Sequence, residues 1–346
     1  MPTSTSRTGS SRQLAAAAQD TTAPSSDRDA HLTRHTARQP ERRTGRRPAA
    51  PVQAGPRWAR PVLVRLGVLA VAMIAVQGLV QGTAREVVGG NPFDNGHPLA
   101  LLLITVPGAL LGLGIYTALV RRLEGRRVAE LAPRAAVGGL ARGALVGSVM
   151  FGAVLAVLAV NGSYRMTGTG PVSSVVTALA LAVSAGVVEE LTFRGVLFRL
   201  VETRLGTWGA LAVSAVLFGA VHLANPHATV WSAIAIALEA GVMLGAAYAA
   251  TRTLWVPIGL HTAWNLVQSV SGAPVSGTGG DAPSLITASF PGSSVLTGGA
   301  FGPEAGLPAL VVGCAAAAVF LFIAARRGRL RPADLRRTST GAPSGN

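Results

Sequence analysis

The chain has 346 residues, of which 49% are hydrophobic and only 13% are charged. A soluble domain normally carries about a quarter charged residues, so this composition argues against a soluble globular protein. The formal net charge is +15, but the arginines gather in the terminal regions and between apolar runs, which indicates membrane orientation and no nucleic-acid partner. With Cys314 as its one cysteine, the chain forms neither an intramolecular disulfide nor a cysteine-rich metal cluster.

The N-terminal residues 1–56 are rich in Ser, Thr, Arg, Pro and Ala and contain no apolar run long enough for the core of a signal peptide. Such a segment cannot bury enough surface to fold alone, which predicts a disordered, basic cytoplasmic tail. The arginine-rich stretch 41–47 has two interpretations, contact with anionic lipid headgroups or a topology signal only.

Eight apolar segments follow, each near the ~20 residues that cross a hydrocarbon core about 30 Å thick. They cover residues 61–81, 98–120, 140–160, 172–194, 206–224, 229–249, 253–270 and 306–325. Backbone groups in lipid need internal hydrogen-bond partners, and no alternating β-barrel pattern is visible, so each segment is predicted as a helix. The expected fold is therefore all-α, a polytopic membrane helix bundle of about eight transmembrane helices. Region 57–171 holds its N-terminal transmembrane helices.

The loops between these segments alternate in arginine content. Arginines cluster after the second, fourth and eighth segments, whereas the stretch 271–305 has none. The positive-inside rule then predicts a multi-pass protein of the cell membrane with both termini cytoplasmic, although Arg85 and Arg165 lie in the outer loops. The Gly-, Ser- and Pro-rich stretch 271–305 is predicted as a flexible extracytoplasmic loop, 306–325 as the last transmembrane helix and 326–346 as a basic cytoplasmic tail.

The fourth apolar segment contains charged residues that are costly in lipid. Glu189 and Glu190 are adjacent, and Arg194 follows Glu190 by four residues, so the last two share a helical face and can pair. Ionisable groups inside a membrane cost about 2.5–3.5 kcal/mol each on insertion scales and therefore indicate function by default. The alternative is an interfacial cluster that only anchors the helix.

Two later segments also carry polar side chains. If the chain turns back near Gly206, Glu190 lies 16 residues before the turn and His222 lies 16 residues after it, at similar depth in a helical hairpin. His261 and Asn265, four residues apart, share one face of the seventh segment. Taken singly, each of these residues is more simply a structural hydrogen-bonding residue; three such helices together favour a functional site.

The three polar motifs resemble those of a known family, the CAAX-protease and bacteriocin-processing (CPBP) intramembrane peptidases. The resemblance covers about residues 172–270, implies that this region is the catalytic core with the active site inside the bundle, and leaves out the tail 1–56 and the loop 271–305. The residues that carry it, and that it implies are catalytic, are Glu189, Glu190, Arg194, His222, His261 and Asn265.

Peptide hydrolysis needs an activated water, a stabilised oxyanion and a proton for the leaving amine. The hypothesis that the resemblance supports assigns Glu189 and His222 to the water, with Glu190 and Arg194 setting orientation and electrostatics. Either glutamate is open as the base.

His261 and Asn265 are assigned to the oxyanion. A divalent metal such as zinc, bound by Glu189, His222 and His261, is the second possibility that the resemblance leaves open beside a metal-free glutamate mechanism. No H-E-x-x-H helix occurs in the chain.

The substrate implied by the resemblance is a membrane-associated or prenylated protein or peptide that reaches the site from the membrane lipids. The alternative is a non-catalytic membrane partner, or a bacteriocin-immunity-type protein, that retains the fold. A proton-coupled transporter is a third class, disfavoured because no repeat is evident. Glu239 and His227 match no motif position; Glu239 is interpreted first as a structural residue and second as an additional site residue.

Overall fold

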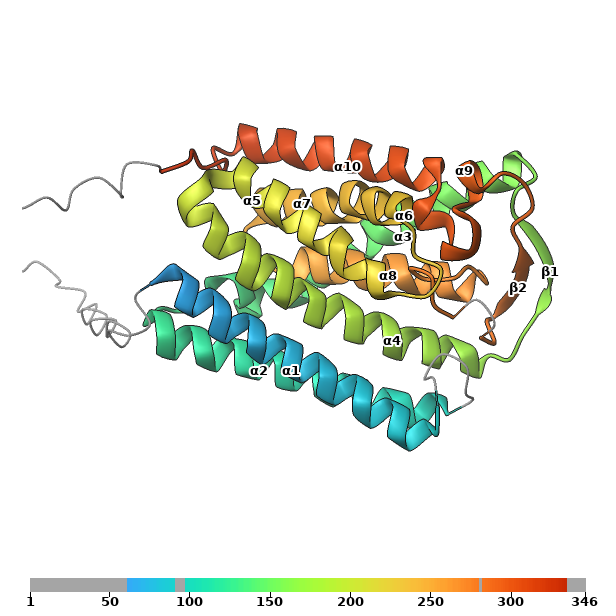
Figure 1. Cartoon of the computed structure of the whole chain (residues 1–346), viewed down its shortest axis with the longest axis horizontal. Helices are drawn as coiled ribbons and strands as arrows, with labels where there is room; N and C mark the ends of the chain where they lie inside the picture. The colour runs from blue at the N-terminus through green and yellow to red at the C-terminus, as the bar shows by residue number, and fades with distance from the viewer. Residues whose placement is uncertain (1–60, 91–96, 280–281, 335–346) are drawn as a thin grey trace, which may run out of the picture. The chain divides into compact units, whose positions relative to one another are not determined.

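The structure is a computed structural model that describes residues 61–90, 97–279 and 282–334. The predicted tail 1–56 lies outside these residues, as does the end of the predicted tail 326–346 from residue 335 onward. The described part of the chain forms an all-α bundle (Figure 1), in which α1 begins and α10 ends at the same end.

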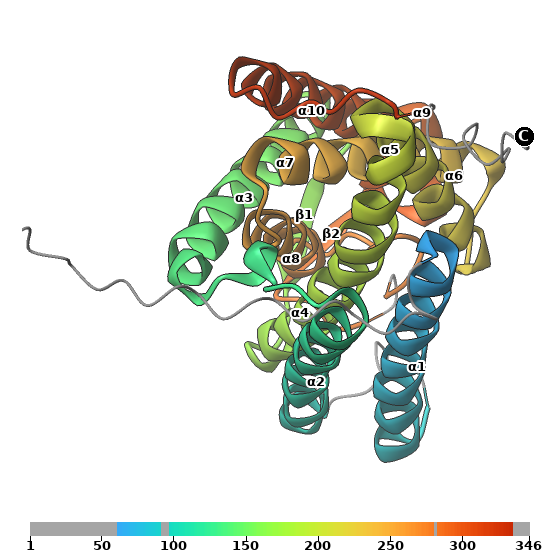
Figure 2. The same cartoon turned by 90° about the vertical axis from the view of Figure 1, so that its left-hand side faces the viewer.

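Three long helices come first, α1 (Val62–Val88), α2 (Pro98–Glu124) and α3 (Ala136–Val160). Helices α1 and α2 each end at a glycine with positive φ, Gly89 and Gly125, which terminates a helix at no steric cost because glycine lacks a Cβ atom. Two short 3₁₀ turns, η2 (Ala129–Leu131) and η3 (Pro133–Ala135), lie between α2 and α3. Helices α1 and α2 lie side by side along α4 (Figures 1 and 2).

A helical hairpin follows. It begins with α4 (Ser173–Glu190), continues through the π-helical segment η4 (Leu191–Phe198) and ends with α5 (Arg199–Val221). Within α5, Gly206 has φ 67° and ψ −178°, which breaks the helix and reverses the chain. The predicted turn at Gly206 is therefore confirmed, and α5 packs back against η4 (Figure 1).

The second half of the bundle is made of shorter pieces. A 3₁₀ turn, η5 (His222–Ala224), leads into α6 (Val230–Ile236), the π-helical segment η6 (Ala237–Val242), and α7 (Met243–Thr251). Then come α8 (Trp255–Val270) and, at the C-terminal side, α10 (Leu307–Arg326). Viewed from one end, α8 lies inside the ring formed by the other helices (Figure 2).

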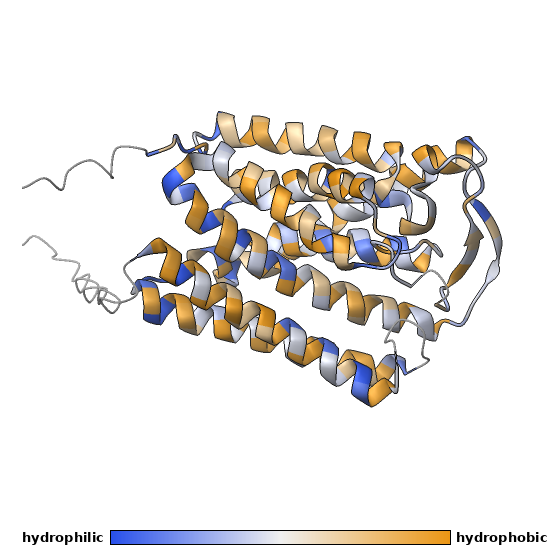
Figure 3. Ribbon diagram, viewed as in Figure 1, coloured by the Kyte–Doolittle hydropathy of each residue, from blue (hydrophilic) through white to orange (hydrophobic). Residues whose placement is uncertain are grey.

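Six helices of the described residues are long and apolar enough to cross a membrane, by length and composition. They are Val62–Val88, Pro98–Glu124, Pro133–Val160, Ser173–Ala224, Val230–Thr251 and Leu307–Arg326. Apolar residues cover most of these helices (Figure 3). The chain is a multi-pass membrane helix bundle, but the predicted count of eight is not confirmed, because the Gly206 hairpin counts as one continuous helix and α8 has only 16 residues.

The stretch 271–305 is more regular than predicted. Strand β2 (Ile286–Ser289) pairs antiparallel with β1 (Arg165–Thr169), and α9 (Ser294–Thr297), η7 (Gly299–Phe301) and η8 (Pro303–Ala305) follow. Phe301 and Glu304 are buried. The prediction of a flexible extracytoplasmic loop did not include these short elements, in which glycine and proline make tight turns that fold the segment onto the bundle.

Glycines on one face of α3 set the position of α8. A Cβ atom at Gly143 would lie 2.1 Å from the Val256 carbonyl oxygen, and one at Gly147 would lie 2.3 Å from the Leu260 carbonyl oxygen. Gly139, one turn earlier, meets Trp255 in the same way. Small residues four apart let membrane helices approach closely. Sequence reasoning missed this pattern, although the spacing is visible in the sequence.

Candidate active site

The predicted pairing of Glu190 with Arg194 is confirmed. Arg194 Nη1 donates to Glu190 Oε1 at 2.9 Å, and both side chains have no exposed surface. The two residues lie where α4 passes into the π-helical segment η4. Such π-helical insertions are frequent at functional sites. Since a buried ion pair is costly to assemble, its position inside an apolar bundle indicates a role beyond packing.

Arg194 also joins η4 to η6. Its Nη2 atom donates to the carbonyl oxygens of Ala240 and Gly241, at 3.1 and 3.0 Å. In a π-helical segment the carbonyls leave the regular α-helical hydrogen-bonding pattern, so a side-chain donor can reach them. The guanidinium carbon lies 4.7 Å from the ring centroid of Phe218, in cation–π contact. Arg194 therefore fixes α5, η4 and η6 relative to one another.

His261 brings α8 to the same carboxylate. Its Nδ1 atom lies 3.0 Å from Glu190 Oε1, and Arg194 and His261 thus share one oxygen of Glu190. Glu189 is half-buried and interacts electrostatically with both Arg194 and His261. One oxygen of each glutamate, Oε2, has no protein hydrogen-bond partner among the described residues. Both oxygens are buried, and neither glutamate is among the residues that line the neighbouring cavity.

The fifth site residue, His222, is oriented by its own helix. Its Nδ1 atom lies 2.7 Å from the Phe218 carbonyl oxygen. A carbonyl oxygen only accepts, so Nδ1 carries the hydrogen and Nε2 is the free acceptor of the neutral ring. His222, His261 and Asn265 line one cavity of about 20 Å³, room for a single water molecule. Residues of the second and third motifs thus line the cavity, and the first motif is connected to it through the contact between Glu190 and His261.

Two carboxylates outside the three motifs line this cavity. Glu239, in η6, and Glu304, in η8, come from elements outside the three motifs. Glu304 accepts hydrogen bonds from Trp264 Nε1, at 3.1 Å, and from the backbone nitrogen and hydroxyl of Ser276, at 2.8 and 2.7 Å. Sequence reasoning missed Glu304, because no local signal shows that a glycine-rich stretch returns to the site. His227 does not line the cavity.

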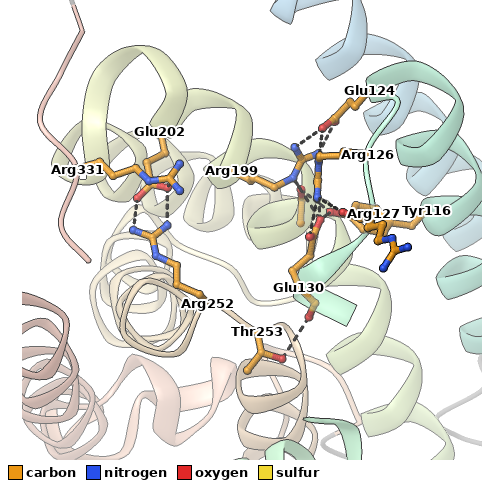
Figure 4. A network of polar contacts seen from close by, with 11 residues as sticks. Tyr116, Glu124, Arg126, Arg127, Glu130, Arg199, Glu202, Arg252, Thr253 and Arg331 are labelled. Carbon is orange, nitrogen blue, oxygen red and sulfur yellow. Dashed lines mark hydrogen bonds and ion pairs between the residues drawn. The ribbon is translucent and has the colours of Figure 1, made fainter. Parts of the chain in front are cut away.

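A polar network braces one end of the two site helices (Figure 4). Glu130, in η2, accepts from Tyr116 Oη at 2.8 Å and from Arg126 Nη1 and Nη2 at 2.8 and 2.6 Å. Tyr116 Oη also lies 2.9 Å from the carbonyl oxygen of Gly195 in η4. The backbone carbonyl of Glu130 accepts from Leu254, directly before α8, at 2.9 Å. This Glu130 network therefore connects η4 to the start of α8.

A protein-family model matches part of the chain. The model described as type II CAAX prenyl endopeptidase Rce1-like matches residues 171–267. This match supports the CAAX-protease family that the sequence motifs indicated. The match runs from the start of α4 to the last turns of α8, so it contains all six predicted site residues and leaves α1 to α3 and α10 outside. No curated protein and no solved structure matches the chain.

The resemblance to CAAX proteases left a zinc ion open, so the arrangement of the possible ligand side chains bears on this question. Among residues 61–90, 97–279 and 282–334, no group of three or more His, Cys, Asp or Glu side chains is arranged to hold a metal ion. The predicted zinc ligands Glu189, His222 and His261 form no such group, although the Nδ1 atoms of His261 and His222 face protein oxygens, as the second ring nitrogen of a zinc-bound histidine usually does. Zinc binding therefore stays a prediction, and the steps below are assigned to residues of the chain.

Proposed function

We propose that the chain is an intramembrane endopeptidase of the cell membrane, with both termini cytoplasmic, that hydrolyses peptide bonds of lipidated or membrane-associated proteins or peptides. The proposal rests mainly on one contact. His261 and Arg194 both contact the same buried oxygen of Glu190, although His261 lies 71 residues after Glu190 in the sequence. His261 also lines the neighbouring water-sized cavity. A matched CAAX-protease segment that holds these residues supports the same activity.

Water activation is assigned to His222 and Glu189. The bond from His222 Nδ1 to the Phe218 carbonyl leaves Nε2 as an acceptor at the cavity. Glu189 has a buried oxygen, Oε2, without a protein partner. A lone pair and a carboxylate oxygen can hold a water molecule and remove its proton as it attacks the peptide carbonyl. Glu190, engaged by Arg194, orients the site and is the second candidate for the base.

Oxyanion stabilisation is assigned to His261 and Asn265. The hydrogen bond between His261 Nδ1 and Glu190 favours the doubly protonated imidazole, in which Nε2–H is a donor. Asn265 lies one turn further along α8, lines the same cavity and carries an amide N–H. Preorganised donors of this kind are worth most where water is excluded, because a low dielectric strengthens them.

A membrane-embedded site favours particular substrates. The cavity lies inside a bundle whose outer surface is apolar (Figure 3), so a substrate held in the lipid can approach it laterally. A prenyl chain anchors a peptide in the bilayer, since each buried CH₂ group contributes about 0.8 kcal/mol to membrane binding. We therefore propose prenylated peptides as the first substrate class to test.

The test is hydrolysis of a quenched, prenylated CAAX peptide by the purified protein in lipid nanodiscs. The variants Glu189→Gln and His222→Ala are each expected to lower kcat by about 10²–10⁴-fold, the usual contribution of general acid–base groups. His227→Asn is the matched control, because this histidine lies outside the cavity and asparagine tolerates its positive φ of 58°.

Three outcomes of this assay distinguish a peptidase from a non-catalytic protein. Activity lost in both site variants and kept in the control supports the peptidase. Full activity in Glu189→Gln and in Glu190→Gln would refute the assigned chemistry. A folded wild-type protein that cleaves neither the prenylated peptide nor an unmodified membrane-helix peptide supports the alternative, a non-catalytic membrane partner.

A further inference from the structure

Glu239 differs from every other acidic residue of the site. It has no exposed surface, it lines the cavity with His222, His261 and Asn265, and both of its carboxyl oxygens lack a protein hydrogen-bond partner among the described residues. Glu190, in contrast, is paired with Arg194. A buried carboxyl with no donor facing it is unfavourable for packing alone. The feature therefore needs an explanation in the chemistry of the cavity.

The backbone around Glu239 holds it in this position. Glu239 lies in η6, whose following carbonyls, those of Ala240 and Gly241, are bound by Arg194. Behind η6, α10 approaches so closely that a Cβ atom at Gly313 would lie 2.8 Å from the Cβ atom of Glu239. The side chain is thus confined between α10 and the cavity, and its position is coupled to the Glu190–Arg194 ion pair.

The surroundings of Glu239 favour its neutral acid form, because both of its oxygens are buried without a donor among the described residues. Glu304 lines the same cavity and already accepts three hydrogen bonds. The ionisable groups that face it across the cavity are His222 and His261. A carboxylate beside a second carboxylate, without a donor of its own, is less stable than a carboxylic acid. A neutral acid carries a proton that it can give to a reacting group.

We propose that Glu239 is a further catalytic residue, the general acid that protonates the leaving amine; this role rests on the proposed peptidase function. Water oxygen bonds to the peptide carbonyl carbon while its proton passes to the base. The C–N bond then breaks, its electron pair stays on nitrogen, and nitrogen takes the proton of the Glu239 carboxyl. The base returns its proton to Glu239 through the cavity, so protons and electrons balance over one turnover.

The experiment compares an amide and an ester. The prenylated CAAX peptide is prepared in two forms, with the normal scissile amide and with an ester oxygen in place of the scissile nitrogen. An alkoxide can leave without first gaining a proton, whereas an amine cannot. Wild type and Glu239→Gln are assayed on both, with Glu239→Asp as the variant that keeps a carboxyl group. Glutamine matches glutamate in shape, and thermal unfolding of each variant checks its fold.

Glu239→Gln is expected to lower kcat for the amide by about 10²–10³-fold, to change its KM less than about threefold and to leave ester hydrolysis within about threefold of wild type. Glu239→Asp is expected to recover part of the amide activity. An equal loss on amide and ester shows a structural role and overturns the proposal, and so does an unchanged amide rate. Wild-type protein inactive on both forms instead refutes the proposed function itself, together with this role.

Discussion

Removal of the charge at Glu130 should destabilise the bundle by a measurable amount. Glu130 has 5% of its surface exposed and accepts from Tyr116 and from two nitrogens of Arg126. Hydrogen bonds to charged groups contribute about 1.5–3 kcal/mol each. Glutamine keeps one acceptor oxygen but loses the charge, and Arg126 is 31% exposed, so solvent screens part of the loss. We expect Glu130→Gln to lower the free energy of unfolding by about 2 kcal/mol.

The effect should depend on pH in one direction. Burial raises the pKa of Glu130, but hydrogen bonds and charge from Arg126 lower it more, so the folded pKa lies below the ordinary value of 4.5. A lowered folded pKa contributes stability that is fully present above the unfolded pKa and is lost as pH falls towards the folded pKa. The difference between wild type and Glu130→Gln should therefore be constant from pH 6 to 8 and shrink below about pH 4.5.

Denaturant titration in detergent, followed by tryptophan fluorescence at several pH values, measures this difference. Glu86→Gln is the control, because Glu86 is an exposed carboxylate outside the Glu130 network. Tyr116→Phe completes a double-mutant cycle, and we expect a coupling free energy of about 1 kcal/mol between Glu130 and Tyr116. Equal unfolding free energies for wild type and Glu130→Gln, or a difference that grows at acid pH, would refute this reasoning.

Three other predictions concern packing, the buried ion pair and the metal. Gly143→Val places side-chain atoms against the α8 backbone and should lower the free energy of unfolding by at least about 1–3 kcal/mol. The control is Gly152→Val on the same helix, which should be tolerated because an added Cβ atom there meets no atom within 4 Å. Equal losses in the two variants would contradict the close approach of α3 and α8. Arg194→Met should lower the free energy of unfolding by about 3–5 kcal/mol because it leaves Glu190 buried without its cation. Arg194→Lys should not restore activity, because one ammonium group cannot reach Glu190 and two η6 carbonyls at once. An active lysine variant would disprove the need for all three contacts. Enzyme freed of metal by chelation, and shown by elemental analysis to be metal-free, should keep its peptidase activity, whereas activity restored only by added zinc would overturn the metal-free mechanism.

The sequence predicted the hairpin and the polar motifs because their signals are local. The cost of charge in lipid singled out Glu189, Glu190 and Arg194, and glycine at position 206 together with equal spacing to Glu190 and His222 placed the turn. The Glu190–Arg194 pair followed from helical periodicity alone. The roles of these residues in catalysis stay predictions, since geometry places them together without showing a reaction.

Other features could not be read from local patterns. The number of spans depends on whether the Gly206 hairpin is counted once or twice and on whether the 16-residue α8 is counted, so the predicted eight is not confirmed. The π-helical segments η4 and η6 have no local signal in the sequence, and they are joined by hydrogen bonds of Arg194 across 46 and 47 residues. Glu304 reaches the cavity only through the packing of 282–305 onto the bundle. Each of these is a long-range contact, and tertiary packing overrides local preference there.

The placement of unpaired acceptors in the bundle itself supports catalysis over a purely structural role. A structural cluster lowers its free energy when every buried polar atom finds a partner. Here Arg194 binds Glu190, two carbonyls and the Phe218 ring, although its Nε atom has no partner among the described residues. Glu189 and Glu190 each have one buried oxygen without a partner in the same part of the chain, and Glu239 has two. These oxygens belong to α4 and η6, the elements that Arg194 holds together. In the proposed hydrolysis, a water molecule and a peptide N–H are the donors from which such oxygens would accept.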